Sequence, residues 1–228
     1  MQYQLLQKPD FSLVKILFEQ AGEQMLVESS AMVARDTAMQ MKTQMTGGLL
    51  GAAKRKLLGG ESLFQNTFTA TAPGQTLYLA PGPEGDVEVI NCDGVTPIFL
   101  SSGNFLASAP SVQLDTKWGG AKGFFSGAGM FLLKAGGVGP LFFGCYGGVH
   151  AVDVGPNGYI CDTSHIVGFT GNLDYRVTKV GGMKSLFLSG EGLVCEFRGQ
   201  GRLWISTRNP ASLTHFLEPF RPVKSNNS

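Results

Sequence analysis

The chain has 228 residues and a mass of 24.3 kDa, which is enough for one large domain or two small ones. Its 18 Lys and Arg residues against 17 Asp and Glu residues leave a formal charge of +1. This balance excludes a strongly basic nucleic-acid binder, which needs surplus cations to displace the counterions of its ligand. Charged residues make up 15% of the chain, against about 25% in typical soluble domains, so we expect neighbouring subunits to cover part of the surface.

No segment has the pattern of a secretory signal or of a membrane span. Residues 1–8 are polar, and the longest charge-free stretch in the apolar half, 135–149, has fifteen residues of which six are Gly. A spanning helix needs about 20 predominantly apolar residues. The four cysteines form no CxxC pair, so we expect reduced core cysteines, no metal site and a cytoplasmic protein. They are Cys92, Cys145, Cys161 and Cys195.

Three segments share one pattern, in which a short alternating run, a turn with Gly, a second short run and an apolar triplet follow one another. The segments begin at Ser12, Asp86 and Gly148, and their turns contain Ala21-Gly22, Asp93-Gly94 and Asn157-Gly158. Asp-Gly and Asn-Gly tolerate the positive φ of hairpin turns. The pattern therefore predicts a β-hairpin at each of the three places.

The intervals between matching positions are nearly constant at 18, 18 and 17 residues. The matching positions are Val14 and Met32, Val87 and Phe105, and Val149 and Ile166. Seven residues later an alternating strand is expected, starting at Met39, Val112 and Leu173. Alternation places one face of such a strand in the core and the other in water. A glycine-rich loop and further strands complete each unit.

These offsets predict a single all-β domain over residues 1–228, built from three internal repeats at about 11–84, 85–146 and 147–210. No unit of that size would bury a sufficient core alone. We therefore expect the repeats to pack with pseudo-threefold character into a compact β-helix or barrel-like fold. The C-terminal tail, 211–228, breaks the pattern, and residues 211–216 are expected to form one helical turn or to cover an open edge.

Six segments carry a family resemblance: GGLLGAAKRKLLGGESLFQNTFTA (47–70), SSGNFLAS (101–108), GMFLLKAGG (129–137), DTSHIVGF (162–169), LDYRVTKVGGMKS (173–185) and GEGLVCEFRGQGRLWISTRNP (190–210). They resemble the family named for altered inheritance of mitochondria, a mostly bacterial group with a mitochondrial branch. The resemblance covers nearly the whole chain. One departure is Ala128, which stands where the family tends to carry an acidic residue, as Glu191 does in the third repeat.

The resemblance implies an all-β fold related to the Trp RNA-binding attenuation protein (TRAP-like), with duplicated β units that are prone to form rings or trimers. It implies no established enzymatic activity. The mitochondrial branch is associated with inner-membrane organisation, which points to membranes without identifying a reaction.

Residues suited to catalysis are sparse. The glycine-rich segments 119–123 and 181–185 lack the GxxxxGK[ST] spacing of a phosphate loop, and no GxSxG occurs. Asp162, Ser164 and His165 lie close together, but neighbouring side chains on a strand point to opposite faces, so Ser164 is not expected to partner His165. We expect Asp162 to act as a turn acceptor and His165 to be a hydrogen-bonded structural residue; a ligand or proton-sensing site is the alternative. We expect no enzyme and no cofactor.

The first repeat carries four to six residues more than the other two between Met32 and Leu63. The extra residues fall in an insert, 47–60, that contains leucines and cations but no acid. Its candidate binding residues are Leu49, Leu50, Lys54, Arg55, Lys56, Leu57 and Leu58. Four of them have the spacing of one stripe of a short helix. The insert either packs on its own or a neighbouring subunit, or projects to contact a partner or a membrane surface.

The sequence therefore favours a non-enzymatic scaffold or interaction protein that self-assembles, with a trimer expected, and that contacts a protein partner or a membrane periphery through the insert. The alternative is a small-ligand or nucleic-acid binding module on a TRAP-like fold. The near-neutral charge makes nucleic acid an unfavourable ligand.

Overall fold

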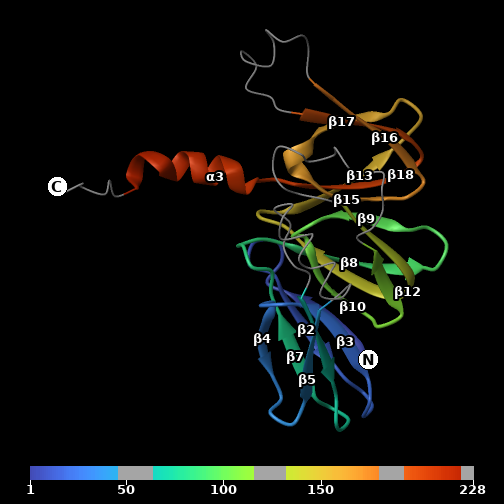
Figure 1. Ribbon diagram of the computed structural model, residues 1–228, viewed down its shortest axis with the longest axis vertical. Coiled ribbons are helices and arrows are strands. Elements are labelled where there is room, and N and C mark those ends of the chain that lie inside the picture. Colours follow the sequence, from blue (N-terminus) through green and yellow to red (C-terminus); the bar gives the residue numbers. More distant parts are fainter. Residues whose placement is uncertain (46–63, 116–131, 180–192, 222–228) are drawn as a thin grey trace.

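The computed structural model describes residues 1–45, 64–115, 132–179 and 193–221. Within these ranges the chain is predominantly β-sheet, as expected, with one short α-helix near the C-terminal end. Figure 1 shows the strands stacked along the long axis, with the N-terminal part at one end and the C-terminal part at the other. No described helix is long and apolar enough to cross a membrane. The insert 47–60, Ala128 and the segments 119–123 and 181–185 lie outside the described residues.

The N-terminal part pairs its strands in two sets. β2 and β4 both pair with β7, whereas β3 and β5 both pair with β6. In β2 the alternation is clear, because Val14 and Ile16 are fully buried while Lys15 between them is not. The strands are β1 (Gln2–Leu6), β2 (Leu13–Leu17), β3 (Gln24–Glu28), β4 (Met32–Arg35), β5 (Gln40–Met45), β6 (Phe64–Thr69) and β7 (Thr76–Leu79).

The middle part is organised around one long strand of thirteen residues, β12. The N-terminal half of β12 pairs with β9 and β11, and its C-terminal half pairs with β8 and β10. The strands are β8 (Val87–Asp93), β9 (Ile98–Ser101), β10 (Phe105–Ser108), β11 (Val112–Asp115) and β12 (Leu132–Gly144).

In the C-terminal part, β13 and β15 pair with β18, and β14 and β16 pair with β17. The strands are β13 (Val149–Val154), β14 (Tyr159–Asp162), β15 (Ile166–Thr170), β16 (Leu173–Lys179), β17 (Leu193–Gly199) and β18 (Gly201–Ser206). A 3₁₀ turn, η2 (Thr163–His165), precedes β15, and the helix α3 (Pro210–Leu217) and the 3₁₀ turn η3 (Glu218–Phe220) follow β18.

The predicted strand starts agree with the structure to within one residue. β11 and β16 begin at Val112 and Leu173 as predicted, and β5 begins at Gln40, one residue after the predicted start. The inner faces of β11 and β16 are buried at these first residues. Met39, the predicted start in the first repeat, is also buried at 3% exposure, whereas Met41 of β5 is 47% exposed, since β5 lies at the end of its sheet.

The three glycine turns have the predicted backbone but not the predicted pairing. Gly22, Gly94 and Gly158 all have positive φ, between 74° and 87°. However, the strands on either side of each turn do not pair with each other, so the expectation of three hairpins was wrong. For example, β2 pairs with β1 and β7 and not with β3, which follows it. Likewise, β14 pairs with β17 alone and not with β13, which precedes it. The first and third turns take the chain from one sheet to another, whereas the middle turn joins β8 and β9, which both pair with β12.

A closed barrel is not present in the described part of the chain. The strands form sheets of four, eleven and three strands, and the eleven-stranded sheet ends at β13 on one side and β5 on the other. The physical reason is visible in β9 and β10, in which all four residues are buried. A strand of a simple barrel packs one face inside and wets the other, whereas these strands are covered on both faces.

The apolar cores are shared between the parts of the chain. Neighbouring side chains of β12 point to opposite faces, so Phe142 joins the cluster of the N-terminal part, whereas Phe143 packs near Trp204 of the C-terminal part. The two rings of Phe143 and Trp204 lie edge to face with centroids 5.3 Å apart. Phe99 of β9 belongs to a third cluster with Phe169 and Phe197. Each of the three clusters therefore contains side chains from more than one part of the chain.

A buried carboxylate joins the starts of the three parts. Asp86, just before β8, is 3% exposed. Its Oδ1 accepts hydrogen bonds from the Ser12 hydroxyl and the Val87 N–H, both at 2.8 Å, and its Oδ2 accepts one from the Val149 N–H at 3.4 Å. Lys8 Nζ lies 3.5 Å from Oδ1. One side chain thus fixes the entry of β2, β8 and β13.

Backbone contacts at the same junction require Gly85. The Ser12 N–H donates to the Gly85 carbonyl at 2.9 Å, and Gly85 forms a parallel bridge with Gly147. A Cβ atom at Gly85 would lie 1.9 Å from the Cys145 carbonyl oxygen. The close approach of these backbones is therefore possible only without a side chain.

We predict that Asp86→Asn lowers the free energy of unfolding by about 1–3 kcal/mol, because an amide presents N–H groups to donors that need an acceptor. Urea unfolding followed by circular dichroism measures the change. Asp174→Asn is the matched control, since Asp174 is exposed and its replacement should change the free energy by less than about 0.5 kcal/mol. Equal unfolding midpoints for the two variants would contradict the role given to Asp86.

Candidate functional site

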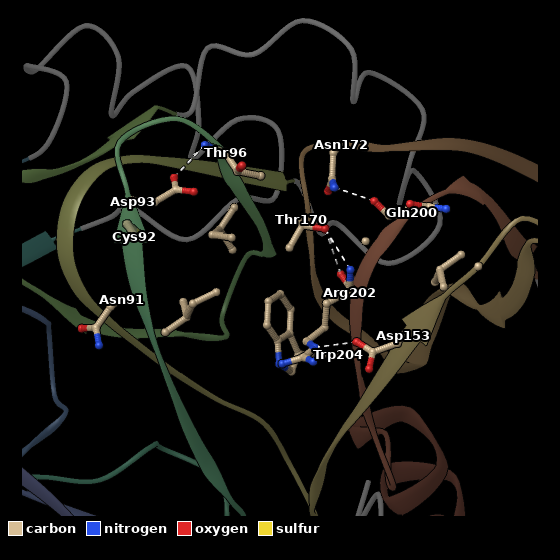
Figure 2. A pocket seen from close by; sticks show the side chains of 15 residues that line it. Asn91, Cys92, Asp93, Thr96, Asp153, Thr170, Asn172, Gln200, Arg202 and Trp204 are labelled. Atoms are coloured by element: carbon tan, nitrogen blue, oxygen red, sulfur yellow. Dashed lines mark hydrogen bonds and ion pairs between the residues drawn. The ribbon is translucent and has the colours of Figure 1, made fainter.

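A cavity of about 620 Å³ lies between the turn after β8 and the ends of β13, β15 and β18. Figure 2 shows Asn91, Asp93 and Thr96 on one side and Thr170, Arg202 and Asp153 on the other, with Trp204 between them. The remaining lining residues are Ile90, Cys92, Ile98, Val154, Gly155, Asn172, Gln200 and Gly201. The cavity therefore lies between the middle part of the chain and the C-terminal part.

Hydrogen bonds to the backbone fix the turns that line the cavity. Asp93 Oδ1 accepts from the N–H groups of Val95 and Thr96 at 2.8 and 2.7 Å, which holds the turn before β9 and lowers the pKa of Asp93. On the opposite wall, Thr170 Oγ1 accepts from the Arg202 N–H at 2.9 Å. Asn172 Nδ2 donates to the Gln200 carbonyl beside it. The walls are thus held in place without a ligand.

One ion pair lies at the mouth of the cavity. Arg202 Nε donates to Asp153 Oδ1 at 2.8 Å across the β13–β18 ladder, where the two residues are directly opposite. The hydrogen bond lowers the pKa of Asp153 and raises the pKa of Arg202. Both side chains are more than half exposed, so the pair orients the two groups rather than adding much stability.

Several polar groups of the cavity are not used by the protein itself. Within the described residues, the side-chain amides of Asn91 and Gln200 have no hydrogen-bond partner, and neither do Asp153 Oδ2 and the terminal nitrogens of Arg202. Asp153 Oδ2 and the terminal nitrogens of Arg202 therefore offer an acceptor and donors side by side to a bound molecule.

Asp162 is used locally. Its Oδ1 accepts from the Ser164 N–H at 2.7 Å and from the Ser164 hydroxyl at 2.6 Å, which caps the 3₁₀ turn η2. The hydroxyl of Ser164 thus points to Asp162 and not to His165. This arrangement uses both groups in a turn, as expected for an acidic residue that precedes one.

His165 links β18 to the C-terminal helix. Its Nδ1 lies 2.7 Å from the Ser206 carbonyl oxygen, and its Nε2 lies 3.0 Å from Asn209 Nδ2. A carbonyl accepts only, so Nδ1 carries the hydrogen, and Nε2 accepts from the Asn209 amide in the neutral ring. Asn209 Oδ1 in turn accepts from the Ser212 N–H at 2.8 Å and caps α3. Asp162 and His165 do not line the cavity.

The helix α3 and the turn η3 carry an exposed apolar stripe. Leu213, Phe216, Leu217 and Phe220 stand at i, i+3, i+4 and i+7, and their exposed fractions are 38, 66, 46 and 73%. No residue of α3 or η3 is buried. Figure 1 shows the helix pointing away from the sheets. The expectation of a helical turn near 211–216 is met, but these residues cover no described sheet edge.

The four cysteines are buried and free, as expected. Burial raises the pKa of the Cys145, Cys161 and Cys195 thiols to about 12, and that of Cys92 by a smaller amount. Cys161 and Cys195 are directly opposite each other in the β14–β17 ladder. Sequence spacing does not reveal this pair, because 33 residues lie between Cys161 and Cys195 along the chain. Only the pairing of β14 with β17 brings the two cysteines together.

We predict that the native protein reacts slowly with a thiol reagent such as Ellman's reagent at pH 8, because protonated buried thiols are poor nucleophiles. In denaturant all four thiols should react rapidly. Unfolded thiols ionise near pH 9, whereas the folded ones stay protonated up to about pH 12. Stability should therefore fall as pH rises above 9. Rapid reaction of the native protein would contradict this description of the core.

Fold and cavity together define the molecule as a layered all-β protein with a polar pocket between two of its parts. Comparison with known proteins identifies its family. The family model described as mitochondrial biogenesis AIM24 matches residues 3–208, so the chain belongs to this family, and the resemblance seen in the sequence is confirmed.

Two similar proteins come from Streptococcus pyogenes. An uncharacterised protein of serotype M6 is 28% identical over 233 residues, which cover 99% of this chain and 93% of the relative. A crystal structure of a protein from the same species, a structural-genomics target, has a TM-score of 0.76 at 26% identity and covers 96% of this chain and 99% of that chain. The likeness extends over the whole fold, and neither description names an activity.

Sequence reasoning missed the cavity. Trp204, which lies at the back of the cavity, is 3% exposed, and no sequence motif marks Arg202 or Asp153, which lie at its border. The available signal was the composition of the turns, since Asp93, Thr96, Asn172 and Gln200 are polar residues at the ends of predicted strands. Their convergence depends on how β8 and β18 are placed by β12 and β15, which no local pattern shows.

Proposed function

We propose that the protein is a non-enzymatic interaction protein that assembles with copies of itself. The observation that carries this proposal is the exposed apolar stripe of α3 and η3. The spacing of the stripe is that of a helix that lies in an apolar groove. The helix is also well formed at its start, because Asn209 caps it and Pro210 occupies its first turn. A rigid apolar helix that projects into water favours a binding partner.

A second copy of the chain is the partner that the surface favours. Exposed apolar side chains also lie on β4 (Met32 and Val33) and on β14 (Tyr159 and Ile160). Each of these strands is at the end of its sheet. The stripe of one copy and an apolar edge of another are different surfaces, and such heterologous contacts form a ring when the rotation between copies closes and an open filament when it does not. We propose the closed form, a trimer.

The strand pairing supports a build from three units. We count β2, β8 and β13 as the first strands of the three parts. In the N-terminal and C-terminal parts, the first and third strands pair with the last strand, and the second and fourth strands pair with the strand before it. In the middle part, the two halves of β12 take the places of these two strands. We infer that the units 11–84, 85–146 and 147–210 are structural repeats. Duplicated β units are also what the family resemblance implies for a TRAP-like fold, and we propose that relation on the same ground.

We predict that Phe216→Asp combined with Phe220→Asp shifts the oligomer towards the monomer. Two charges within the stripe would have to be buried without partners, which is costly. Light scattering coupled to size exclusion measures the mass, which is near 24.3 kDa for one chain. Phe11→Asp is the control, because Phe11 is 71% exposed and lies before β2. A monomeric parent protein, or an unchanged assembly in the double variant, would overturn the proposal.

The insert 47–60 is proposed as a second contact, to a protein partner or a membrane periphery. Its three cations, Lys54, Arg55 and Lys56, have no acid within the insert, so they favour an anionic surface, at about 1 kcal/mol each near an anionic leaflet.

We predict that replacing the three cations with Gln keeps the fold and weakens binding to vesicles that contain phosphatidylserine, most clearly at low salt, because screening reduces such attraction. Vesicle co-sedimentation measures the binding. A second variant, in which Leu49, Leu50, Leu57 and Leu58 become Ser, should lose assembly if these side chains pack between subunits. Wild-type behaviour of both variants would show that the insert is only a loop.

A second candidate function is that of a ligand-binding module, and the cavity between β8 and β18 favours it. The walls are held in place by backbone hydrogen bonds, and the unused polar groups of Asp153 and Arg202 border the space between them. Nucleic acid is an unfavourable ligand for this site, because Asp153 opposes the charge of Arg202 at 2.8 Å.

A further inference from the structure

We propose that the cavity between the middle and C-terminal parts binds a neutral, polyhydroxylated molecule of carbohydrate type. This inference rests on the second candidate function, the ligand-binding module. The volume of about 620 Å³ falls within the range of about 300–1,000 Å³ that is usual for small-molecule sites. It is large enough for a monosaccharide or a disaccharide.

The charges of the cavity argue against an anionic ligand. Asp93, Asp153 and Arg202 line it, so two carboxylates and one guanidinium sum to −1. The guanidinium is hydrogen-bonded to Asp153, and this contact partly neutralises it. A phosphate or a carboxylate would therefore meet a site with no net positive charge.

The unused hydrogen-bonding groups argue for hydroxyls. Asn91 and Gln200 each offer an amide oxygen and an NH₂ group, Asp153 Oδ2 only accepts, and the terminal nitrogens of Arg202 only donate. A hydroxyl donates one hydrogen bond and accepts two, so neighbouring hydroxyls can satisfy Arg202 and Asp153 at the same time. A ligand that carries only acceptors would leave Asp153 Oδ2 without a donor.

Apolar residues form the floor of the cavity. Ile98 of β9 and Val154 of β13 are 2 and 4% exposed, so Ile90 of β8, which is half-buried, offers most of the apolar surface to the C–H face of a sugar ring. Trp204 closes the cavity between the walls and packs against Phe143. At 3% exposure its indole forms part of the wall and is no free stacking platform. The site thus combines apolar surface with polar groups around it, as ligand pockets do.

Prior ordering of the walls lowers the cost of binding. Asp93 holds its turn through the Val95 and Thr96 N–H groups, and Thr170 holds the start of β18 through the Arg202 N–H. Because these turns are fixed in the free protein, a ligand need not order them. The side chains of Asn91 and Gln200, which have no partner among the described residues, would turn towards the ligand.

The test uses the full chain with Trp118→Phe, which leaves Trp204 as the one remaining Trp. Its emission reports directly on the cavity. The probes are glucose, N-acetylglucosamine, maltose and myo-inositol as neutral polyols, AMP as an anion and putrescine as a cation, and isothermal titration calorimetry confirms each binding curve. We expect saturable binding of at least one polyol and none of AMP.

Gln200→Ala and Asn91→Ala are the site variants, and each should weaken binding about fivefold, the value of one hydrogen bond. Gln4→Ala is the matched control: Gln4 is an exposed amide on β1, far along the chain from the cavity residues, and its replacement should leave the affinity unchanged. Both site residues lack partners among the described residues, so their loss should not disturb folding, which circular dichroism checks.

Each other outcome is decisive. Binding of AMP or putrescine but of no polyol would overturn the carbohydrate class and keep the ligand-binding module. Polyol binding that Gln200→Ala and Asn91→Ala leave unchanged would place the site elsewhere and overturn the proposal. Failure of every probe to bind at millimolar concentration would overturn both the carbohydrate class and the module, while self-assembly through α3 would be unaffected.

Discussion

The architecture depends on the Asp86 carboxylate, which is buried and accepts hydrogen bonds from the first residues of three different β units. Ser12, Val87 and Val149 stand at or next to the starts of β2, β8 and β13, and all three donate to it. A buried carboxylate needs such donors, since an unpaired charge in the core costs far more than it returns. The three chain segments supply the hydrogen-bond donors that Asp86 needs, and Asp86 in turn holds the three segments together at one point. Gly85 beside it allows the backbones to approach closely enough for this to happen.

From that junction, the parts of the chain separate into layers that share their cores. Because β12 presents Phe142 to one side and Phe143 to the other, the middle part supplies apolar surface to both of its neighbours. The cavity lies where the middle and C-terminal parts meet at the ends of their strands. Strand ends leave polar turn residues at the surface, and two sets of turns that face each other form a polar site. The geometry of the cavity is therefore a consequence of how the parts are joined.

The C-terminal helix has the opposite character, since it is attached to the body mainly at its start. Asn209 donates to His165 with one end of its amide and caps α3 with the other. The direction of the helix is thus set by a residue of the sheet region, while its apolar stripe is exposed. The proposed assembly and the proposed ligand binding involve separate surfaces, so a variant of one should leave the other intact. This separation is why Phe216 and Gln200 give independent tests.

Much of the fold could be predicted from the sequence, because strand positions depend on local patterns. Alternation placed the starts of β11 and β16 correctly, and Gly22, Gly94 and Gly158 have the positive φ that their turns predicted. The family was also evident from the motifs. Pairing was not predictable, since a glycine turn can close a hairpin or pass the chain to another sheet, and the choice depends on distant partners such as β7, β12 and β18. For the same reason the sequence determined the reduced, apolar character of the cysteines and the likeness to the family, whereas only the tertiary structure decided that Asp86 lies at the centre, that Asp153 and Arg202 border a cavity, and that Phe216 faces water. These are contacts between residues far apart along the chain, and their energies exist only once the sheets have formed.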